Sequence, residues 1–369
     1  MKLFQQLLVA PAALGLLAPI SANANEVNLN EISNYSDVES IEFANSFNND
    51  VRTENPLLAG GEGLVDNHSH DGGFSETTTA SFGSNFYVGS VSENTLTETT
   101  TFSYDFSMGL STSFTGEDSL DVAIIGGNVN TDTVAVDAVM GGDGTADALM
   151  LDGISYTFPL GGFTVIAGDG VGVDDLNSGA CAYSAFTDIA SDCGTSNVGG
   201  DTDAAVAASY DFGNGFTAAA GIGFGTETTG VLSDEDASTV GLELAYAADT
   251  YAVSLAFTDN DEMIDDASYY SIQGSYTPDA AYTVSAGYEF DDDDADSMFI
   301  GLTTEVGAGS LSIGATTQTL ADDHDDGYIY EVSYSYDVND GINVTPGLFI
   351  VEQSDDDAFG AIVKTSFSF

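Results

Sequence analysis

The chain has 369 residues, of which 60 are Asp or Glu and three are Lys or Arg, so its formal net charge is −57. This balance excludes nucleic-acid binding, because neutralising a phosphate backbone requires Lys and Arg. Strongly acidic chains are often disordered, but 22 Phe and 17 Tyr predict an ordered fold, since disordered chains contain few aromatic residues.

Residues 1–24 have the pattern of a secretory signal peptide. Lys2 is followed by an apolar run from Leu7 to Ile20, and small residues then precede a cleavage site near Ala24. The run is shorter than the roughly 20 residues that a membrane-spanning helix needs. No other stretch of the sequence reaches that length. We therefore expect this segment to be removed on export.

Residues 25–76 predict a periplasmic segment or linker ahead of the main domain. The segment contains His68, His70 and Asp71, whose imidazole and carboxylate groups suit iron, copper or zinc. The same residues are more typical of a polar linker that binds nothing. We favour the linker, and the metal site is the alternative.

From residue 77 onward, short segments alternate apolar and polar side chains. In residues 282–290, apolar and aromatic residues alternate with Thr, Ser, Gly and Glu, and residues 328–336 show the same alternation. A period of two predicts β-strands. A soluble sandwich buries the apolar face, whereas a transmembrane barrel turns it to lipid. Alternation alone therefore leaves both architectures open.

The breaks between the predicted strands alternate in length. Short turns such as 213–215 and 339–341 alternate with longer acidic segments such as 226–237 and 320–327. Outer-membrane barrels have this arrangement, with short periplasmic turns on one rim and long extracellular loops on the other. Counting along residues 77–369 gives about sixteen strands, an even number that places both ends on the short-turn side. The fold class predicted is an all-β transmembrane antiparallel β-barrel.

The final predicted strand, 358–369, ends on an aromatic residue. Its apolar positions include Phe367, and Phe369 is the last residue of the sequence. A C-terminal aromatic strand of this kind resembles the signal that the barrel-insertion machinery of the outer membrane reads. We therefore expect that machinery to be a partner of the chain.

Two stretches of the predicted barrel are the basis of a family resemblance: TFSYDFSMGLSTSFTGED at 101–118 and YTFPLGGFTVIAGDGVGVDDL at 156–176. They resemble cyanobacterial outer-membrane porins of the iron uptake porin type, related to the carbohydrate-selective porin family. PLLAGGEGL at 56–64 resembles the sequence before the barrel in that family. The resemblance implies a homotrimeric diffusion channel among outer-membrane lipids and lipopolysaccharide. Family members also have an N-terminal peptidoglycan-binding module, for which residues 25–73 are too few.

The third long loop, about residues 170–200, contains both cysteines of the chain, Cys181 and Cys193. An oxidising compartment favours a disulfide between them, and free thiols are the alternative. In sixteen-stranded porins the third loop usually folds into the pore. We therefore expect this loop to set the constriction, with carboxylates from Asp174, Asp175, Asp188 and Asp192.

If the aromatic faces meet lipid, the alternate strand positions line a water-filled pore. Those positions hold seven carboxylates and one amine: Asp105, Asp121, Asp211, Glu243, Glu289, Glu305, Glu331 and Lys364. An acidic wall concentrates cations and repels anions within a Debye length of about 8 Å at physiological salt. This predicts a moderate cation preference. In a wide pore the same carboxylates would only solvate the wall, and selectivity would approach that of free diffusion.

The acidic runs 291–294, 322–326 and 355–357 offer oxygen ligands suited to Ca²⁺ or Mg²⁺. None has the glycine and ligand spacing of an ordered calcium loop. We expect solvated outer loops, bridged loosely to lipopolysaccharide by divalent cations, with no specific metal site and no cofactor.

The sequence has no nucleophile elbow, no phosphate-binding loop with its lysine and no zinc-protease helix. It therefore predicts a passive pore for ions and small hydrophilic solutes rather than an enzyme. Two alternatives stay open. One is a ligand-specific channel for sugars or iron complexes, and the other is a secreted acidic β-sandwich at the cell surface.

Overall fold

The computed structural model describes residues 78–369 with short gaps. The gaps are 93–95, 97–98, 143, 196–197, 199–202, 226–237, 262–266, 280, 293–295, 320–325 and 353–356. The predicted signal peptide, the N-terminal segment with His68, His70 and Asp71, and most of the three acidic runs lie outside the described residues.

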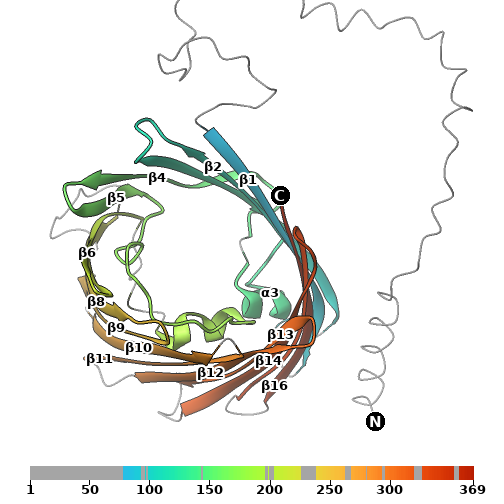
Figure 1. Cartoon of the computed structure of the whole chain (residues 1–369). Helices are drawn as coiled ribbons and strands as arrows, with labels where there is room; N and C mark the ends of the chain where they lie inside the picture. The colour runs from blue at the N-terminus through green and yellow to red at the C-terminus, as the bar shows by residue number, and fades with distance from the viewer. Residues whose placement is uncertain are drawn as a thin grey trace, which may run out of the picture. The chain divides into compact units, whose positions relative to one another are not determined.

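Sixteen antiparallel strands close into one barrel (Figure 1). Each strand pairs with its neighbours in sequence, and β1 pairs with β16 to complete the ring. The strands are β1 (Thr78–Ser92), β2 (Thr101–Thr112), β3 (Ser119–Gly127), β4 (Met150–Leu160), β5 (Phe163–Asp169), β6 (Ala204–Gly213), β7 (Phe216–Phe224), β8 (Ser238–Ala247), β9 (Tyr251–Asp261), β10 (Ala267–Asp279), β11 (Tyr282–Asp291), β12 (Asp296–Val306), β13 (Gly309–Thr319), β14 (Asp326–Asn339), β15 (Ile342–Val351) and β16 (Ala358–Ser368). The predicted closed barrel of about sixteen strands is confirmed.

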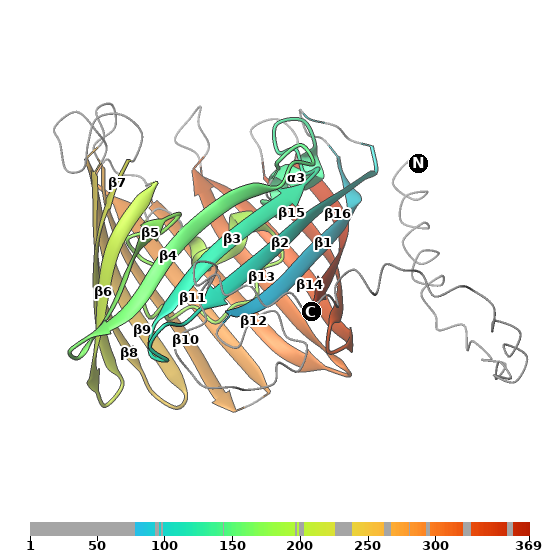
Figure 2. The same cartoon turned by 90° about the horizontal axis from the view of Figure 1, so that it is seen from above.

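The connections alternate in length, as predicted. The short connections, such as 161–162 and 340–341, share one rim, and the two longest connections, 128–149 and 170–203, arise at the other. The first of these long connections contains helix α3 (Ala135–Met140), and the second contains the 3-10 helix η2 (Asp188–Gly194). Figure 2 shows α3 near the rim opposite the short turns. No helix among the described residues is long and apolar enough to cross a membrane.

The two faces of the wall differ in polarity because successive side chains of a strand point to opposite sides. On β11, Ser285 and Glu289 are buried on the inner side, while Tyr288 and Phe290 are 39% and 42% exposed on the outer side. The same alternation recurs on β8, where Leu242 and Leu244 are exposed. The apolar faces therefore cover the outside of the barrel, and the alternative of a β-sandwich with an inward apolar core is wrong.

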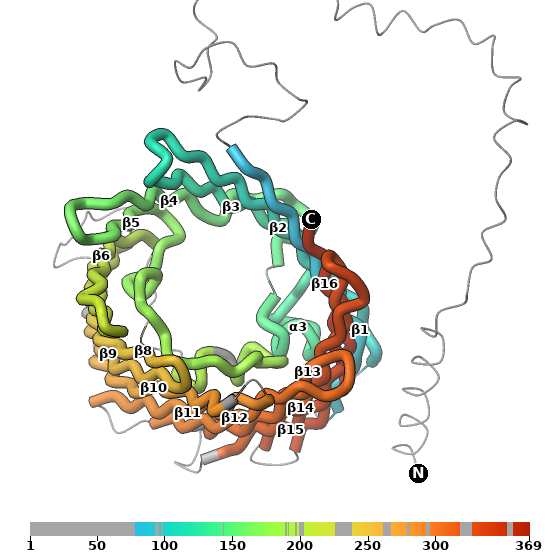
Figure 3. The backbone as a smooth tube through the Cα atoms, viewed as in Figure 1, coloured from blue at the N-terminus to red at the C-terminus, as the bar shows by residue number. Residues whose placement is uncertain are grey.

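Part of the barrel interior is filled by the two longest connections (Figure 3). Helix α3 contributes Val136, Val139 and Met140 to a buried apolar cluster, which Phe186 of the second connection joins. The wall side of the cluster comes from β1 and β14–β16 and includes Phe349. This cluster therefore fills one side of the barrel interior with packed apolar side chains.

Candidate functional site

The connection between β5 and β6, residues 170–203, is called the inner loop below. It runs along the inside of the wall rather than across the barrel, as Figures 1 and 3 show. Val173 lies against Gly221 of β7 and Gly241 of β8, and Phe186 lies against Gly347 of β15. The chain then turns at η2 and returns toward β6. The inner loop is therefore a hairpin that lines the wall from β7 to β15.

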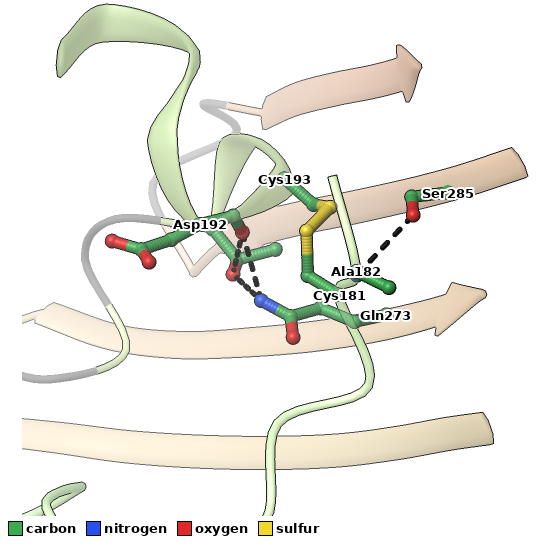
Figure 4. Close-up of a disulfide and its surroundings, with 7 residues drawn as sticks. Cys181, Ala182, Asp192, Cys193, Gln273 and Ser285 are labelled. Atoms are coloured by element: carbon green, nitrogen blue, oxygen red, sulfur yellow. Dashed lines mark hydrogen bonds between the residues drawn. A yellow bond between two sulfur atoms is a disulfide. The ribbon is translucent and has the colours of Figure 1, made fainter. Parts of the chain in front are cut away.

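A disulfide joins the outgoing and returning limbs of this hairpin. Cys181 and Cys193 are bonded, with their Cα atoms 6.0 Å apart. Next to the bridge, the Ala182 N–H donates to the Ser285 hydroxyl at 3.2 Å, and the Gln273 side-chain amide donates to the Asp192 carbonyl at 2.8 Å (Figure 4). The bridge and these hydrogen bonds attach both limbs to β10 and β11.

Glu331 of β14 is the main attachment point of the inner loop. Its side chain is 3% exposed and accepts four hydrogen bonds from the loop. The Tyr183 hydroxyl and the Phe186 N–H each donate to Oε1 at 2.8 Å. The Thr187 N–H and hydroxyl donate to Oε2 at 2.9 and 2.5 Å. Burial and then the negative charge of Glu331 raise the pKa of Tyr183 above its usual value, so its phenol stays a donor.

Two further predicted pore-lining residues are also enclosed. Glu243 of β8 is 6% exposed and accepts a hydrogen bond from the Ser178 N–H at 2.5 Å. Glu289 of β11 is 3% exposed, on the inner strand position between Ser271 and Ser297 of the neighbouring strands. Like Glu331, both lie on the predicted face, yet protein covers their carboxylates instead of leaving them in open solvent.

The other predicted pore-lining residues lie on the same inner face, and Asp211 lines a cavity together with Ser178 and Ala180 of the inner loop. Asp121 is partly exposed on β3, and Asp211 and Glu305 are exposed at the short-turn ends of β6 and β12. Asp105 of β2 accepts hydrogen bonds from the Asn85 side chain at 2.8 Å and from the hydroxyl of Tyr87 at 2.5 Å.

Lys364 of β16 is the only lysine or arginine in the described part of the chain. The strand register places it beside Tyr87 of β1 and Thr345 of β15, and its Nζ lies 5.9 Å from the centre of the Tyr87 ring. One positive charge therefore faces the interior on the side where β1 and β16 close the barrel.

The four predicted constriction-loop carboxylates all belong to the inner loop. Asp188 and Asp192 lie on η2, and both are exposed. Asp174 and Asp175 lie on the outgoing limb, where partial desolvation and then the neighbouring charge of Asp174 raise the pKa of Asp175. The loop therefore presents carboxylates to the barrel interior while the wall carboxylates beneath it are covered.

Sequence reasoning missed the second structure inside the barrel, helix α3. Its Asp137 is 1% exposed and accepts hydrogen bonds from the Ser103 hydroxyl and, at 2.8 Å, from the Asn130 N–H. The available signal was the segment 134–140, which is apolar except for Asp137 and interrupts an otherwise more polar connection. Among the described residues, no group of three or more His, Cys, Asp or Glu side chains could hold a metal ion.

Solved structures of porins have the same fold. OprB of Pseudomonas putida at high pH aligns with a TM-score of 0.63 and 14% identity, over 79% of this chain and 94% of that chain. A mutant porin of Rh. blastica aligns with a TM-score of 0.56 and 15% identity, over 79% and 100% of the two chains. A mutant of OmpT, an outer membrane protein of Vibrio cholerae, with loop L8 deleted, aligns with a TM-score of 0.57 and 13% identity, over 80% of this chain and 100% of that chain.

No family model and no curated protein matches the chain. At such low identities the structural likeness establishes the fold alone. The expected resemblance is therefore supported at the level of a sixteen-stranded porin fold. Membership of the iron uptake porin type stays a proposal.

Proposed function

We propose that this chain is an outer-membrane porin through which ions and small hydrophilic solutes diffuse passively. The observation that carries the proposal is the polarity of the closed barrel: large apolar side chains are exposed outside, and polar side chains face the interior. Exposed apolar side chains on a barrel surface are expected where lipid replaces water. Hydrogen bonding of all sixteen strands to their neighbours also leaves no open sheet edge, as a bilayer requires.

Aromatic side chains on the outer face support the same proposal, because they gather near both ends of the strands. Near the short turns, Phe216 contacts Tyr246, and Tyr246 contacts Tyr251, with ring centres 4.6 and 5.8 Å apart. Near the opposite rim, Tyr270 stacks on Phe290 at 5.2 Å. Membrane barrels have aromatic belts at the two interfaces with water, and the two groups of rings fit those belts.

The proposed pore is bounded by the inner loop and by the part of the wall that the loop leaves open. Asp121, Asp211 and Glu305, together with the loop carboxylates, give this boundary a negative charge. We therefore propose a moderate cation preference, reduced locally by Lys364. In this proposal the inner loop sets the constriction.

A general pore fits the described residues better than a sugar-specific channel. An aromatic ring must be exposed to stack on the apolar face of a sugar. Three of the inner-face rings, Tyr87, Phe299 and Phe349, are at most 3% exposed, and loop or helix residues pack around them. These rings therefore support the inner structure instead of offering a track for sugars.

The proposal extends to the setting of the barrel. We propose that a signal peptide directs export, that the barrel-insertion machinery reads the C-terminal strand, and that the chain forms a homotrimer among lipids and lipopolysaccharide. The short turns would then face the periplasm and the long connections the cell exterior.

A planar-bilayer recording tests the function. Purified chain should insert in discrete conductance steps, and the reversal potential in a salt gradient should have the sign of a cation-preferring channel. Silent membranes together with a monodisperse protein in detergent-free buffer would contradict the pore. Conductance steps with the reversal potential of an anion-preferring channel would support the pore function and contradict the proposed cation preference.

A further inference from the structure

Six glycines on the inner face of the wall lie directly beneath the inner loop. They are distributed over six strands, from β7 to β15: Gly221, Gly241, Gly287, Gly301, Gly314 and Gly347. The loop residues above them are Val173, Tyr183, Phe186 and Cys193. Each glycine thus marks a place where the loop backbone or a loop side chain approaches the strand.

Backbone conformation does not explain these glycines. Glycine inside a strand is unfavourable relative to alanine, and its presence there is usually explained by a positive φ or by close approach of other atoms. None of the six has a positive φ. Close approach of the loop is therefore the remaining explanation. It can be tested with the distances between a Cβ added at each glycine and the loop atoms.

The space above the glycines is too small for a methyl group. A Cβ at position 314 would lie 2.6 Å from Oη and 2.8 Å from Cζ of Tyr183, and a Cβ at position 241 would lie 2.7 Å from Cγ2 of Val173. Non-bonded carbon atoms prefer separations of about 3.5–4.0 Å. An alanine at position 314 or 241 would therefore displace the Tyr183 ring or the Val173 side chain by about 1 Å. At positions 221 and 287 the nearest atoms are backbone carbonyl oxygens of Val173 and Cys193, so an alanine there would push the loop backbone away from the wall.

We propose that these six glycines hold the inner loop flat against the wall and thereby determine the width of the pore. The inference rests on the proposed pore function. The glycines act as positioning residues: they contact no solute, and they set how far the loop protrudes. At Gly314 the displacement would also pull the Tyr183 hydroxyl away from Glu331, which it now reaches at 2.8 Å.

The chain offers a matched control on the same face. Gly109 of β2 also faces the interior, but a Cβ there would meet only the Ser81 hydroxyl, at 2.8 Å, which can rotate away. Gly109→Ala therefore adds one methyl group to the inner wall without moving the inner loop. Gly314→Ala adds the same methyl group beneath the loop.

The experiment compares single-channel conductance and the size limit for polyethylene glycols in the wild type, Gly314→Ala and Gly109→Ala. We expect Gly314→Ala to lose conductance and to exclude smaller polymers, while Gly109→Ala matches the wild type. In a Tyr183→Ala background the loss caused by Gly314→Ala should disappear, because the obstructing ring is gone. Equal conductance of the two glycine variants, or an undiminished loss without the ring, would overturn the proposal.

Hydrogen exchange separates this inference from the pore function itself. The Phe186 and Thr187 amides donate to Glu331, so their exchange should accelerate in Gly314→Ala and not in Gly109→Ala, whether or not the protein conducts. If the wild type forms no channels but the variants show this exchange pattern, the proposed pore function is rejected. The proposed role of the six glycines in positioning the loop then stands. If Gly314→Ala fails to show the heat-modifiable gel mobility of a folded barrel, Gly241→Ala beneath Val173 provides the second variant.

Discussion

The inner wall contains two kinds of carboxylate that differ in what covers them. Beneath the inner loop, Glu243 and Glu331 are almost fully buried and accept hydrogen bonds from loop backbone atoms. Near the short-turn ends of their strands, Asp211 and Glu305 are exposed, and Asp121 is partly exposed. All five share one side of the sheet and one strand periodicity. Position on the inner face therefore does not define a role, because the loop decides which carboxylates meet water.

The buried carboxylates are stabilised without a basic partner. Lys364 is the one lysine or arginine in the described part of the chain, and its Nζ lies over the Tyr87 ring. Charge-assisted hydrogen bonds from neutral donors are about twice as strong as neutral pairs. Glu331 receives four such bonds. In so acidic a chain, carboxylates can therefore attach a loop as well as attract cations.

The largest effect is expected at Glu331. In Glu331→Gln the side chain loses its charge and turns an NH₂ group toward donors, so loop attachment should weaken by about 3 kcal/mol, since hydrogen bonds to charged groups contribute about 1.5–3 kcal/mol. Exchange of the Phe186 and Thr187 amides should then accelerate by about a hundredfold. Hydrogen-exchange mass spectrometry measures this, and single-channel recordings should show added current noise.

Glu305→Gln is the control for this substitution, because Glu305 has the same strand parity and is exposed. We expect it to leave loop exchange unchanged. If both variants give the same exchange rates, the distinction between covered and open carboxylates fails.

Loss of the disulfide should have the next largest effect. Cys181→Ser with Cys193→Ser frees the two limbs of the loop, and we expect about 2 kcal/mol of lost loop stability, at the low end of the usual range because other contacts remain. The Ala182 amide, which donates to Ser285, should exchange faster. The effect should grow in the Glu331→Gln background. Unchanged exchange at Ala182 in both backgrounds would show that the bridge does not restrain the loop.

The contrast between the two groups explains what could be predicted from the sequence. Strand periodicity and alternating turn lengths depend on local pattern, so the sixteen strands, the inner parity of the eight charged residues and the third loop were accessible. Coverage depends on contacts between distant segments: Phe186 and Glu331 are 145 residues apart. Local pattern places Glu305 beside a short turn and Glu331 in the middle of a strand. It does not show which strand positions the loop covers. The glycines in the middle of strands are visible in the sequence. Their role in positioning the loop can be inferred only once the path of the loop is known.

A smaller effect is expected from the open carboxylates. Asp121→Asn with Asp211→Asn should lower the cation-to-anion permeability ratio by about a factor of two or less, because salt screens exposed charges beyond a Debye length. Loop exchange should stay at the wild-type rate. Reversal potentials in a salt gradient measure the ratio. A shift of equal size in Glu331→Gln would contradict the proposal that covered carboxylates contribute little to selectivity.

The smallest effect concerns a carboxylate at the rim, Asp118, in the turn between β2 and β3. It accepts hydrogen bonds from the Tyr156 hydroxyl at 2.5 Å and the Thr115 N–H at 2.7 Å. The Tyr156 hydrogen bond is the main reason that the pKa of Asp118 lies well below its usual value, with the Thr115 hydrogen bonds adding to it and partial desolvation opposing it.

A lowered pKa means that Asp118 stabilises the folded barrel above its ordinary pKa of 3.8 and that this contribution is lost as the pH falls below it. Thermal unfolding in detergent should therefore show a steeper fall in Tm between about pH 5 and pH 2 for the wild type than for Asp118→Asn. Exchange at Phe186, followed over the same pH range, reports separately on the inner loop. Equal slopes for the two proteins would assign acid sensitivity to the carboxylates beneath the loop instead of the rim.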